Sequence, residues 1–148
     1  MRSANGQGCV FHLAFTVTDL DATRRFYTEV IGCDEGSVGD DWCIFDFFGH
    51  KITATLDPMR AGAQTVHEDP LSLRHFGVFI DADKFHDLAS RLQRDGARFV
   101  IEPQMGGKGT AQEQWIMFTT DPSGNGLEFQ SVTHHKSIFW PNGAPQAR

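Results

Sequence analysis

One segment of this chain is repeated, and the repeat limits the possible folds more than any other feature of the sequence. The order strand, helix, strand, strand runs through residues 10–57 and returns in residues 72–133 with one clear additional strand. The two copies align at five pairs: His12 with His75, Gly32 with Gly96, Trp42 with Trp115, Phe45 with Phe118, and Gly49 with Gly124. A period of about 63 residues is typical of a duplicated structural unit. The sequence therefore predicts two tandem βαβββ modules, an α+β fold.

The element boundaries follow from apolar alternation, helix caps and turn residues. The first copy is predicted to contain a strand at 10–17, a helix opened by Asp19 or Asp21 and ended by Gly32, a weak strand at 36–38, and a hairpin of 42–48 with 52–56. The second is predicted to contain a strand at 73–80, a helix opened by Asp81 or Asp83 and ended by Gly96, and strands at 97–101, 114–120 and 126–132. Residues 58–71 form a connector, and residues 134–148 a C-terminal tail, of one domain spanning 1–148.

Composition excludes several classes of partner. A net charge of -6 and a pI near 5.5 disfavour binding to nucleic acids or to anionic membranes, both of which reward clustered Lys and Arg. The sequence contains neither an apolar run of about 20 residues nor the apolar core of a signal peptide, which predicts a soluble, cytoplasmic protein. Three cysteines without C-x-x-C spacing predict reduced structural thiols rather than disulfides or a thiolate zinc site.

Strand alternation places three possible metal ligands on the sheet face opposite the helices. In the first strand of each copy the apolar residues alternate with His12 and with His75, and each histidine is followed two positions later by a small residue. In the last strand Glu128 lies between the apolar residues Leu127 and Phe129, so it also faces away from the apolar side. A single strand histidine or glutamate is usually exposed or satisfied in a core. Two histidines at equivalent repeat positions with a carboxylate match the donors of a facial triad, which favours one metal site.

Four motifs resemble those of the vicinal oxygen chelate superfamily, which includes glyoxalase I, extradiol dioxygenases, and bleomycin and fosfomycin resistance proteins. They are residues 11–20 (FHLAFTVTDL), residues 26–27 followed by Gly32, residues 75–78 (HFGV) and residues 121–129 (DPSGNGLEF). The resemblance implies that the two modules form a cupped, partly closed mixed sheet around a metal, with the helices on its outer face. It also implies that His12, His75 and Glu128 are the protein ligands.

The fourth ligand position of glyoxalase I falls on Thr53 in this sequence, by alignment through Gly49 and Gly124. Threonine is a poor ligand for a catalytic divalent metal, so the site resembles the three-ligand site of extradiol dioxygenases. Those enzymes also use a histidine and a tyrosine near the metal, whereas the only tyrosine here, Tyr27, lies on the first helix. His67 in the connector is the candidate for a role beside the metal.

The remaining histidines are predicted to be structural or exposed. Alternation groups His50 with the packed side of its strand, His86 lies on the second helix, and His134 and His135 follow the last strand. The glycine-rich residues 106–109 lack the spacing of a phosphate-binding loop, so they are predicted to form a loop near the cavity mouth.

These features together predict an extradiol-type dioxygenase that uses Fe(II), a small vicinal-oxygen substrate and O2. Mn, Ni, Co or Zn could take the place of iron. The alternatives are a glyoxalase-like isomerase or lyase with another divalent metal, and a non-enzymatic small-molecule-binding protein of the bleomycin resistance type. Retention of the three ligand residues argues against the last alternative. Superfamily members of this length commonly form homodimers, so a homodimer is expected, with the ligands contributed by one chain or by two.

Overall fold

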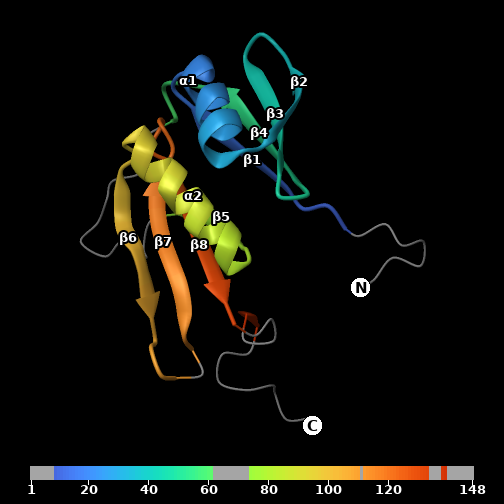
Figure 1. Cartoon of the computed structure of the whole chain (residues 1–148). Helices are drawn as coiled ribbons and strands as arrows, with labels where there is room; N and C mark the ends of the chain where they lie inside the picture. The colour runs from blue at the N-terminus through green and yellow to red at the C-terminus, as the bar shows by residue number, and fades with distance from the viewer. Residues whose placement is uncertain (1–8, 62–73, 111, 134–137, 140–148) are drawn as a thin grey trace. The chain divides into compact units, whose positions relative to one another are not determined.

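The chain forms two compact units, Met1–Ala63 and Gln64–Arg148, which divide inside the predicted connector. The structure, a computed structural model, describes residues 9–61, 74–110, 112–133 and 138–139 (Figure 1). Each unit contains one four-stranded sheet, with the strand orders β1-β4-β3-β2 and β5-β8-β7-β6.

The first unit contains four strands and one helical segment in the predicted order. They are β1 (His12–Val17), α1 (Leu20–Arg25), the π-helical η1 (Phe26–Ile31), β2 (Asp34–Val38), β3 (Trp42–Phe47) and β4 (His50–Leu56). Strand β1 runs parallel to β4, and β3 is antiparallel to both β4 and β2. The weakly predicted strand near residue 36 is thus a real edge strand of this sheet.

The second unit repeats this order and pairing. It contains β5 (His75–Phe79), α2 (Ala82–Asp95), β6 (Phe99–Gly106), β7 (Gln114–Thr120) and β8 (Gly126–Val132). Strand β5 is parallel to β8, and β7 is antiparallel to both β8 and β6. The prediction of two βαβββ modules in an α+β fold is therefore confirmed.

Strand β6 is longer than the predicted segment 97–101. The additional residues include Pro103, which cannot donate a ladder hydrogen bond. However, β6 is an edge strand, and its register with β7 shifts between Ile101 and Gln104. Proline is tolerated at such edge irregularities, so the strand continues to Gly106.

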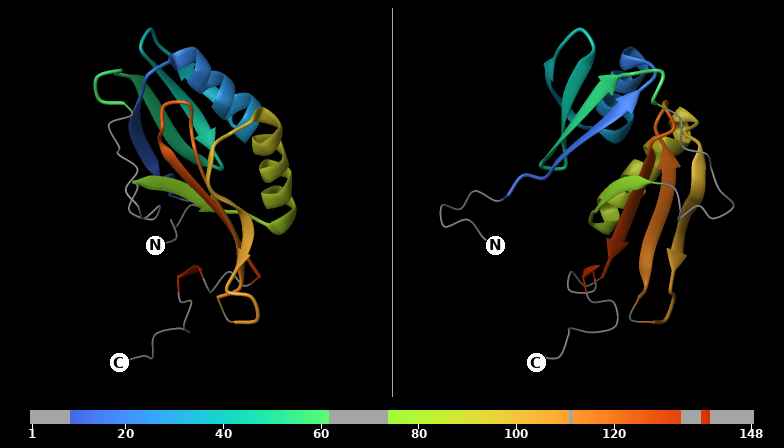
Figure 2. Two further views of the ribbon diagram at one scale, coloured as in Figure 1. Left: turned by 90° about the vertical axis from the view of Figure 1, so that its left-hand side faces the viewer. Right: turned by 180° about the vertical axis from the view of Figure 1, so that it is seen from behind.

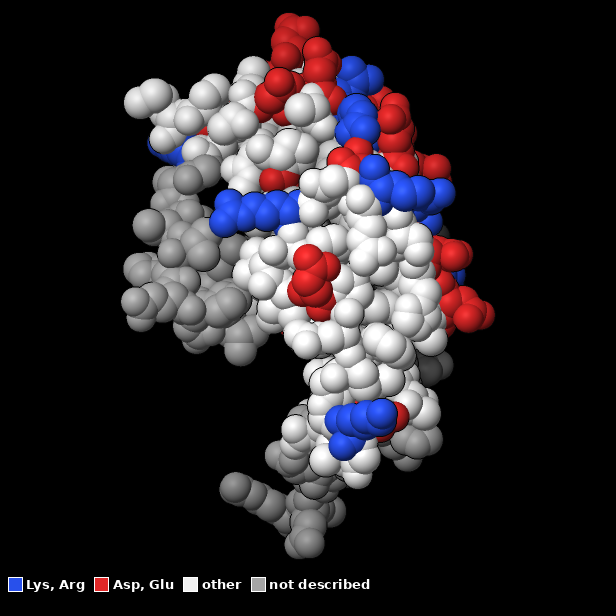
Figure 3. All heavy atoms as spheres, turned by 60° about the vertical axis from the view of Figure 1, so that its left-hand side comes forward, with Lys and Arg blue, Asp and Glu red and all other residues white. Residues whose placement is uncertain are grey.

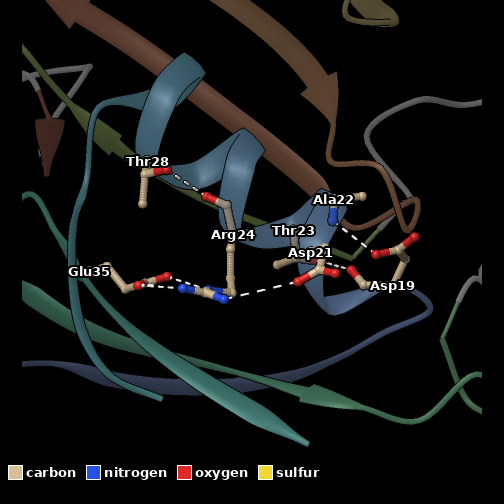
Figure 4. Close-up of polar contacts among 7 residues, drawn as sticks. All are labelled: Asp19, Asp21, Ala22, Thr23, Arg24, Thr28 and Glu35. Atoms are coloured by element: carbon tan, nitrogen blue, oxygen red, sulfur yellow. Dashed lines mark hydrogen bonds and ion pairs between the residues drawn. The ribbon is translucent and has the colours of Figure 1, made fainter. Parts of the chain in front are cut away.

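Helix caps lie where the sequence placed them. The Asp19 carboxylate accepts a hydrogen bond from the Ala22 N–H at 2.9 Å (Figure 4). Asp81 caps α2 in the same way, and Gly32 and Gly96 end the two helical segments in left-handed conformation. The sequence did not predict that the first helix continues from Phe26 as a π-helix. In this segment the N–H of Gly32 donates a hydrogen bond to the carbonyl of Tyr27, five residues earlier.

A charged contact joins the first helix to the edge strand. The Arg24 guanidinium donates two hydrogen bonds to the Glu35 carboxylate, at 2.6 and 2.9 Å (Figure 4). The same contact lowers the pKa of Glu35 and raises the pKa of Arg24. This bidentate pair links α1 to β2.

Each helix covers one face of the sheet of its own unit, as Figure 2 shows. In the first unit Tyr27 is fully buried and stacks on Phe45, with ring centroids 5.1 Å apart. In the second unit α2 packs on β8, where Leu127 and Phe129 are buried. The buried helix residues include Phe85, Leu88 and Leu92, as their spacing predicted.

Two cysteines are buried and one is exposed, and all three are free thiols. Burial raises the pKa of Cys33 to about 12 and that of Cys43 to about 11. At pH 8 the reactive thiolate of either buried residue should exist in roughly one molecule per thousand or fewer. We expect a thiol reagent at pH 8 to modify Cys9 rapidly, and Cys33 and Cys43 only after denaturation or as the pH rises toward 11.

A Cys9→Ser variant is the control for this labelling experiment, because it should lose the fast phase and retain the two slow thiols. Fast labelling of two or more thiols in the native wild-type protein would contradict the burial described above.

Acidic and basic side chains are interspersed on the face drawn in Figure 3. On this face the described residues form no continuous basic surface of the kind that phosphate backbones require. Among the described residues, no helix has the length and apolar character needed to cross a membrane.

Candidate metal centre

Two of the three predicted ligands lie together in the second unit. Nε2 of His75 on β5 lies 3.2 Å from Oε2 of Glu128 on β8, and their side chains are 28% and 15% exposed. The neighbours of Glu128 on its strand, Leu127 and Phe129, are fully buried on the side of α2. The pair therefore lies on the sheet face away from the helix, as strand alternation predicted.

The close approach of β5 to β8 depends on a glycine beside the pair. Gly77 is the register partner of Glu128. A Cβ atom at position 77 would collide with the backbone carbonyl of Glu128. The small residue two positions after His75 thus allows the strands that carry both ligands to pair closely.

An aromatic ring supports the same pair. Phe118 on β7 is the cross-strand partner of Glu128 and is fully buried. Its ring meets the His75 imidazole edge to face, with centroids 4.9 Å apart. Phe118 therefore lies on the ligand face, the sheet face that carries His75 and Glu128, whereas Trp115 packs against Phe85 and His86 of α2.

The turn before β8 sets the position of Glu128 along the sheet. Asp121 is 3% exposed, and its Oδ1 accepts hydrogen bonds from the backbone N–H groups of Ser123 at 2.9 Å and Asn125 at 2.8 Å. Its Oδ2 accepts a third hydrogen bond from the Asn125 side-chain amide at 2.9 Å. Gly124 takes the positive φ of 86° that this turn requires. The first residues of the 121–129 motif thus form a hairpin turn that fixes the β7–β8 register.

His12 lies in the first unit on the corresponding strand, β1, and is exposed on the face away from the helix. Ala14 pairs with Thr53 in β4, just as Gly77 pairs with Glu128 in β8. Strand register therefore confirms that Thr53 occupies, in the first module, the position that Glu128 occupies in the second.

The hydroxyl of Thr53 has an unusual environment. Its Oγ1 is buried and has no hydrogen-bond partner among the described residues. A buried polar atom without a partner in a native structure calls for an explanation such as a bound water, ion or ligand. A water, ion or ligand bound beside Thr53, at the position equivalent to Glu128, would give this hydroxyl a hydrogen-bond partner.

Tyr27 and His50 both lie on the helix-packed side of the first sheet. The Tyr27 side chain projects from η1 onto the sheet and is enclosed by aromatic rings, so it lies on the sheet face opposite His12. His50 is on the packed side, as predicted, where its Nδ1 accepts a hydrogen bond from the Phe11 N–H at 3.2 Å. His86 is exposed on α2. His67, His134 and His135 lie outside the described residues.

The donor chemistry suits a divalent metal, although the described residues of each unit supply only part of a ligand set. Neither unit contains three His, Cys, Asp or Glu side chains gathered around one point among its described residues. The second unit offers an imidazole nitrogen and a carboxylate oxygen side by side, and the first offers one imidazole. Such nitrogen and oxygen donors suit Fe, Mn, Co, Ni and Zn.

Sequence reasoning missed one feature of the ligand face, a cavity of about 260 Å³ in the second unit. Three of its lining residues are the glutamines Gln112, Gln114 and Gln130. Strand alternation places Gln130 on the same sheet face as Glu128, and this was the only sign in the sequence that Gln130 lines a cavity. Glutamines at strand ends are nevertheless usually solvated, so the pattern alone did not reveal a cavity.

Comparison with known proteins identifies relatives along most of the chain. The family model described as Glyoxalase/Bleomycin resistance protein/Dioxygenase superfamily matches residues 10–129. A crystal structure of a glyoxalase/bleomycin resistance protein/dioxygenase from Alicyclobacillus acidocaldarius is 31% identical and has a TM-score of 0.76, with coverage of 94% of this chain and 100% of that chain.

Two further proteins are similar to this chain. Virulence protein STM3117 of Salmonella typhimurium is 26% identical over 117 residues, 79% of each chain. Its crystal structure has a TM-score of 0.59 and covers 86% of this chain and 98% of its own. The fosfomycin resistance protein FosX from Mesorhizobium loti is 16% identical and has a TM-score of 0.63, with coverage of 88% and 97%. At that identity, FosX shares the fold alone.

Proposed function

This chain belongs to the Glyoxalase/Bleomycin resistance protein/Dioxygenase superfamily, and on that premise we propose that it is an extradiol-type dioxygenase that uses Fe(II). The resemblance drawn from the sequence motifs is confirmed by the family match. In the proposed site, His12, His75 and Glu128 hold one metal ion. The substrate is a small molecule with two vicinal oxygen atoms, and O2 is the second substrate.

The observation that carries the proposal is the contact between His75 and Glu128. A histidine and a carboxylate 3.2 Å apart on the face away from the helix form two parts of a facial triad. His12 on the equivalent strand of the first module supplies the third donor. Metal bound by these groups would supply a Lewis acid with open coordination positions for the substrate oxygens and O2.

The protein's own residues contribute orientation and selectivity. Phe118 packs against the His75 ring and holds its Nε2 toward Glu128. Thr53 stands where a fourth carboxylate would be, so a metal held by the other three residues would keep more positions open for a bidentate substrate and O2. This favours a dioxygenase over a glyoxalase-like isomerase. His67 remains the proposed residue for proton transfer beside the metal.

The test compares two reactions of the same protein. Protein reconstituted anaerobically with Fe(II) should consume oxygen when a catechol-like compound is added, as measured with an oxygen electrode. Protein loaded with Ni or Zn is assayed in parallel for isomerisation of a hemithioacetal, and metal-free protein is the blank. Isomerase turnover without oxygen uptake on any chelating substrate would establish the isomerase instead.

A carboxylate introduced at position 53 should add the missing fourth ligand. Thr53 has the strand position of Glu128, so Thr53→Glu is expected to raise metal affinity about tenfold and to suppress oxygen uptake by filling an open position. Metal affinity is measured by competition with a chromophoric chelator. Thr53→Gln, which has similar size without the charge, is the control and should leave affinity near that of the wild type. Unchanged affinity in Thr53→Glu would contradict this placement of residue 53.

A further inference from the structure

The cavity of about 260 Å³ lies within the second unit, and its lining includes Gln130, two residues after Glu128 in β8. Strand residues Phe79, Gln114, Gln130 and Val132 line it, together with Gln112 and Glu113 from the segment before β7. Ile138, after the last strand, closes another side. All of these lining residues belong to the second unit.

Sheet register places this cavity on the face of the His75–Glu128 pair. Gln130 follows Glu128 by two residues in β8, so both side chains point to the same face about 6.6 Å apart along the strand. Phe79 is the register partner of Gln130, and it follows His75 on the same face of β5. Val132 pairs with Gln114 one step further along. A ligand extending from the pair along β8 would therefore enter the cavity.

The polar groups of the cavity are mainly carboxamides. A glutamine side chain both donates and accepts hydrogen bonds and carries no charge. The described lining residues include no Lys or Arg, and their one carboxylate, Glu113, accepts a hydrogen bond from the Gly109 N–H at 2.8 Å. An anion would meet no positive partner among these residues. An uncharged ligand with both a donor and an acceptor would match the amides.

The apolar part of the lining limits the rest of the ligand. Phe79 lines the cavity with a ring that is 41% exposed, and Val132 and Ile138 add aliphatic surface. The volume suits a small ring or short chain rather than a drug-sized molecule. Apolar surface of this kind is covered favourably by a compact hydrophobic group.

We propose that this glutamine-lined cavity binds the part of the substrate remote from the metal, and that this part is uncharged, with a small apolar body and a carboxamide or hydroxyl–carbonyl group. The inference rests on the proposed function, because it assigns the occupant as the substrate of that site. Gln130 and Gln114 are then residues that determine specificity, while His75 and Glu128 bind the metal.

The test uses three probes of nearly equal shape: benzamide, benzoate and benzamidine, which are neutral, anionic and cationic at pH 7. Their dissociation constants are measured on the metal-free, full-length protein by titration in protein NMR spectra. Benzamide should bind about tenfold more tightly than either charged probe. Gln130→Leu and Gln114→Leu should each weaken benzamide binding about tenfold and leave benzoate binding nearly unchanged, because only the neutral amide uses these side chains.

Gln104→Leu is the matched control. Gln104 lies on β6 in register with Ile116, itself the partner of Gln130, but it does not line the cavity. Benzamide binding should be unchanged in this variant. Equal affinity for the three probes, or equal effects of Gln130→Leu and Gln104→Leu, would overturn the inference. Because the probes are measured without metal, absence of metal binding by the wild-type protein would instead refute the proposed function.

Discussion

Alanine at His75 or at Glu128 is expected to lower the affinity of the protein for divalent metal about a hundredfold or more. Each substitution removes one of three proposed protein ligands, and the remaining two cannot hold the ion in a closed geometry. Loss of a group that merely supports a ligand already costs about 10–100-fold in affinity. Both side chains are partly exposed on the face away from α2, so their removal leaves the buried core of the second unit intact.

The measurement is the metal content of protein reconstituted with Fe(II) under anaerobic conditions and then passed over a desalting column. Wild-type protein should retain about one ion per site. His86→Ala and Glu102→Ala are matched controls, because they remove the same residue types from exposed positions on α2 and β6. A His75→Ala protein that retains a full complement of metal at wild-type affinity would refute the assignment of this ligand.

Replacing Asp121 by alanine is expected to lower the free energy of unfolding by about 2–4 kcal/mol. The Asp121 carboxylate is buried and accepts hydrogen bonds from two backbone N–H groups and one side-chain amide. Alanine would leave these donors without their partner in a site that water reaches poorly. The hairpin that sets the β7–β8 register would also lose its main constraint, so metal affinity should fall together with stability.

Asp46 provides the control, because its Oδ1 accepts one hydrogen bond from the Gly49 N–H in a hairpin turn of the first module. Asp46 is exposed, so Asp46→Ala should cost less than about 1 kcal/mol. Both variants are compared by urea denaturation followed by circular dichroism. Equal destabilisation by the two substitutions would show that the buried network around Asp121 contributes no special stability.

The sequence predicted best those elements whose ends are fixed by local chemistry. Strands β7 and β8 begin and end at the predicted residues because the turn at 121–125 separates two clearly apolar runs. Both helices begin at a predicted aspartate cap and end at a predicted glycine. The π-helical winding after Arg25 and the extension of β6 past Pro103 were not predicted, since each depends on packing or strand pairing rather than on local preference.

The candidate site divides in the same way. Alternation along single strands was enough to predict that His75 and Glu128 share a face, and the structure brings them into contact. The alignment of Thr53 with Glu128 followed from turn glycines and is confirmed by strand register. The glutamine-lined cavity could not be predicted, because its walls come from β5, β7, β8 and the segments around them, and no single strand pattern contains it.

Gly77 has a consequence for how the chain can vary. The residue has no side chain with which to touch a ligand, yet a methyl group at this position would push β8 away from β5. The first module has Ala14 at the equivalent position, so its paired strands β1 and β4 tolerate that methyl group. A mutational survey scored by metal binding alone would therefore group position 77 with the proposed ligands, although its contribution is to let two backbones approach closely.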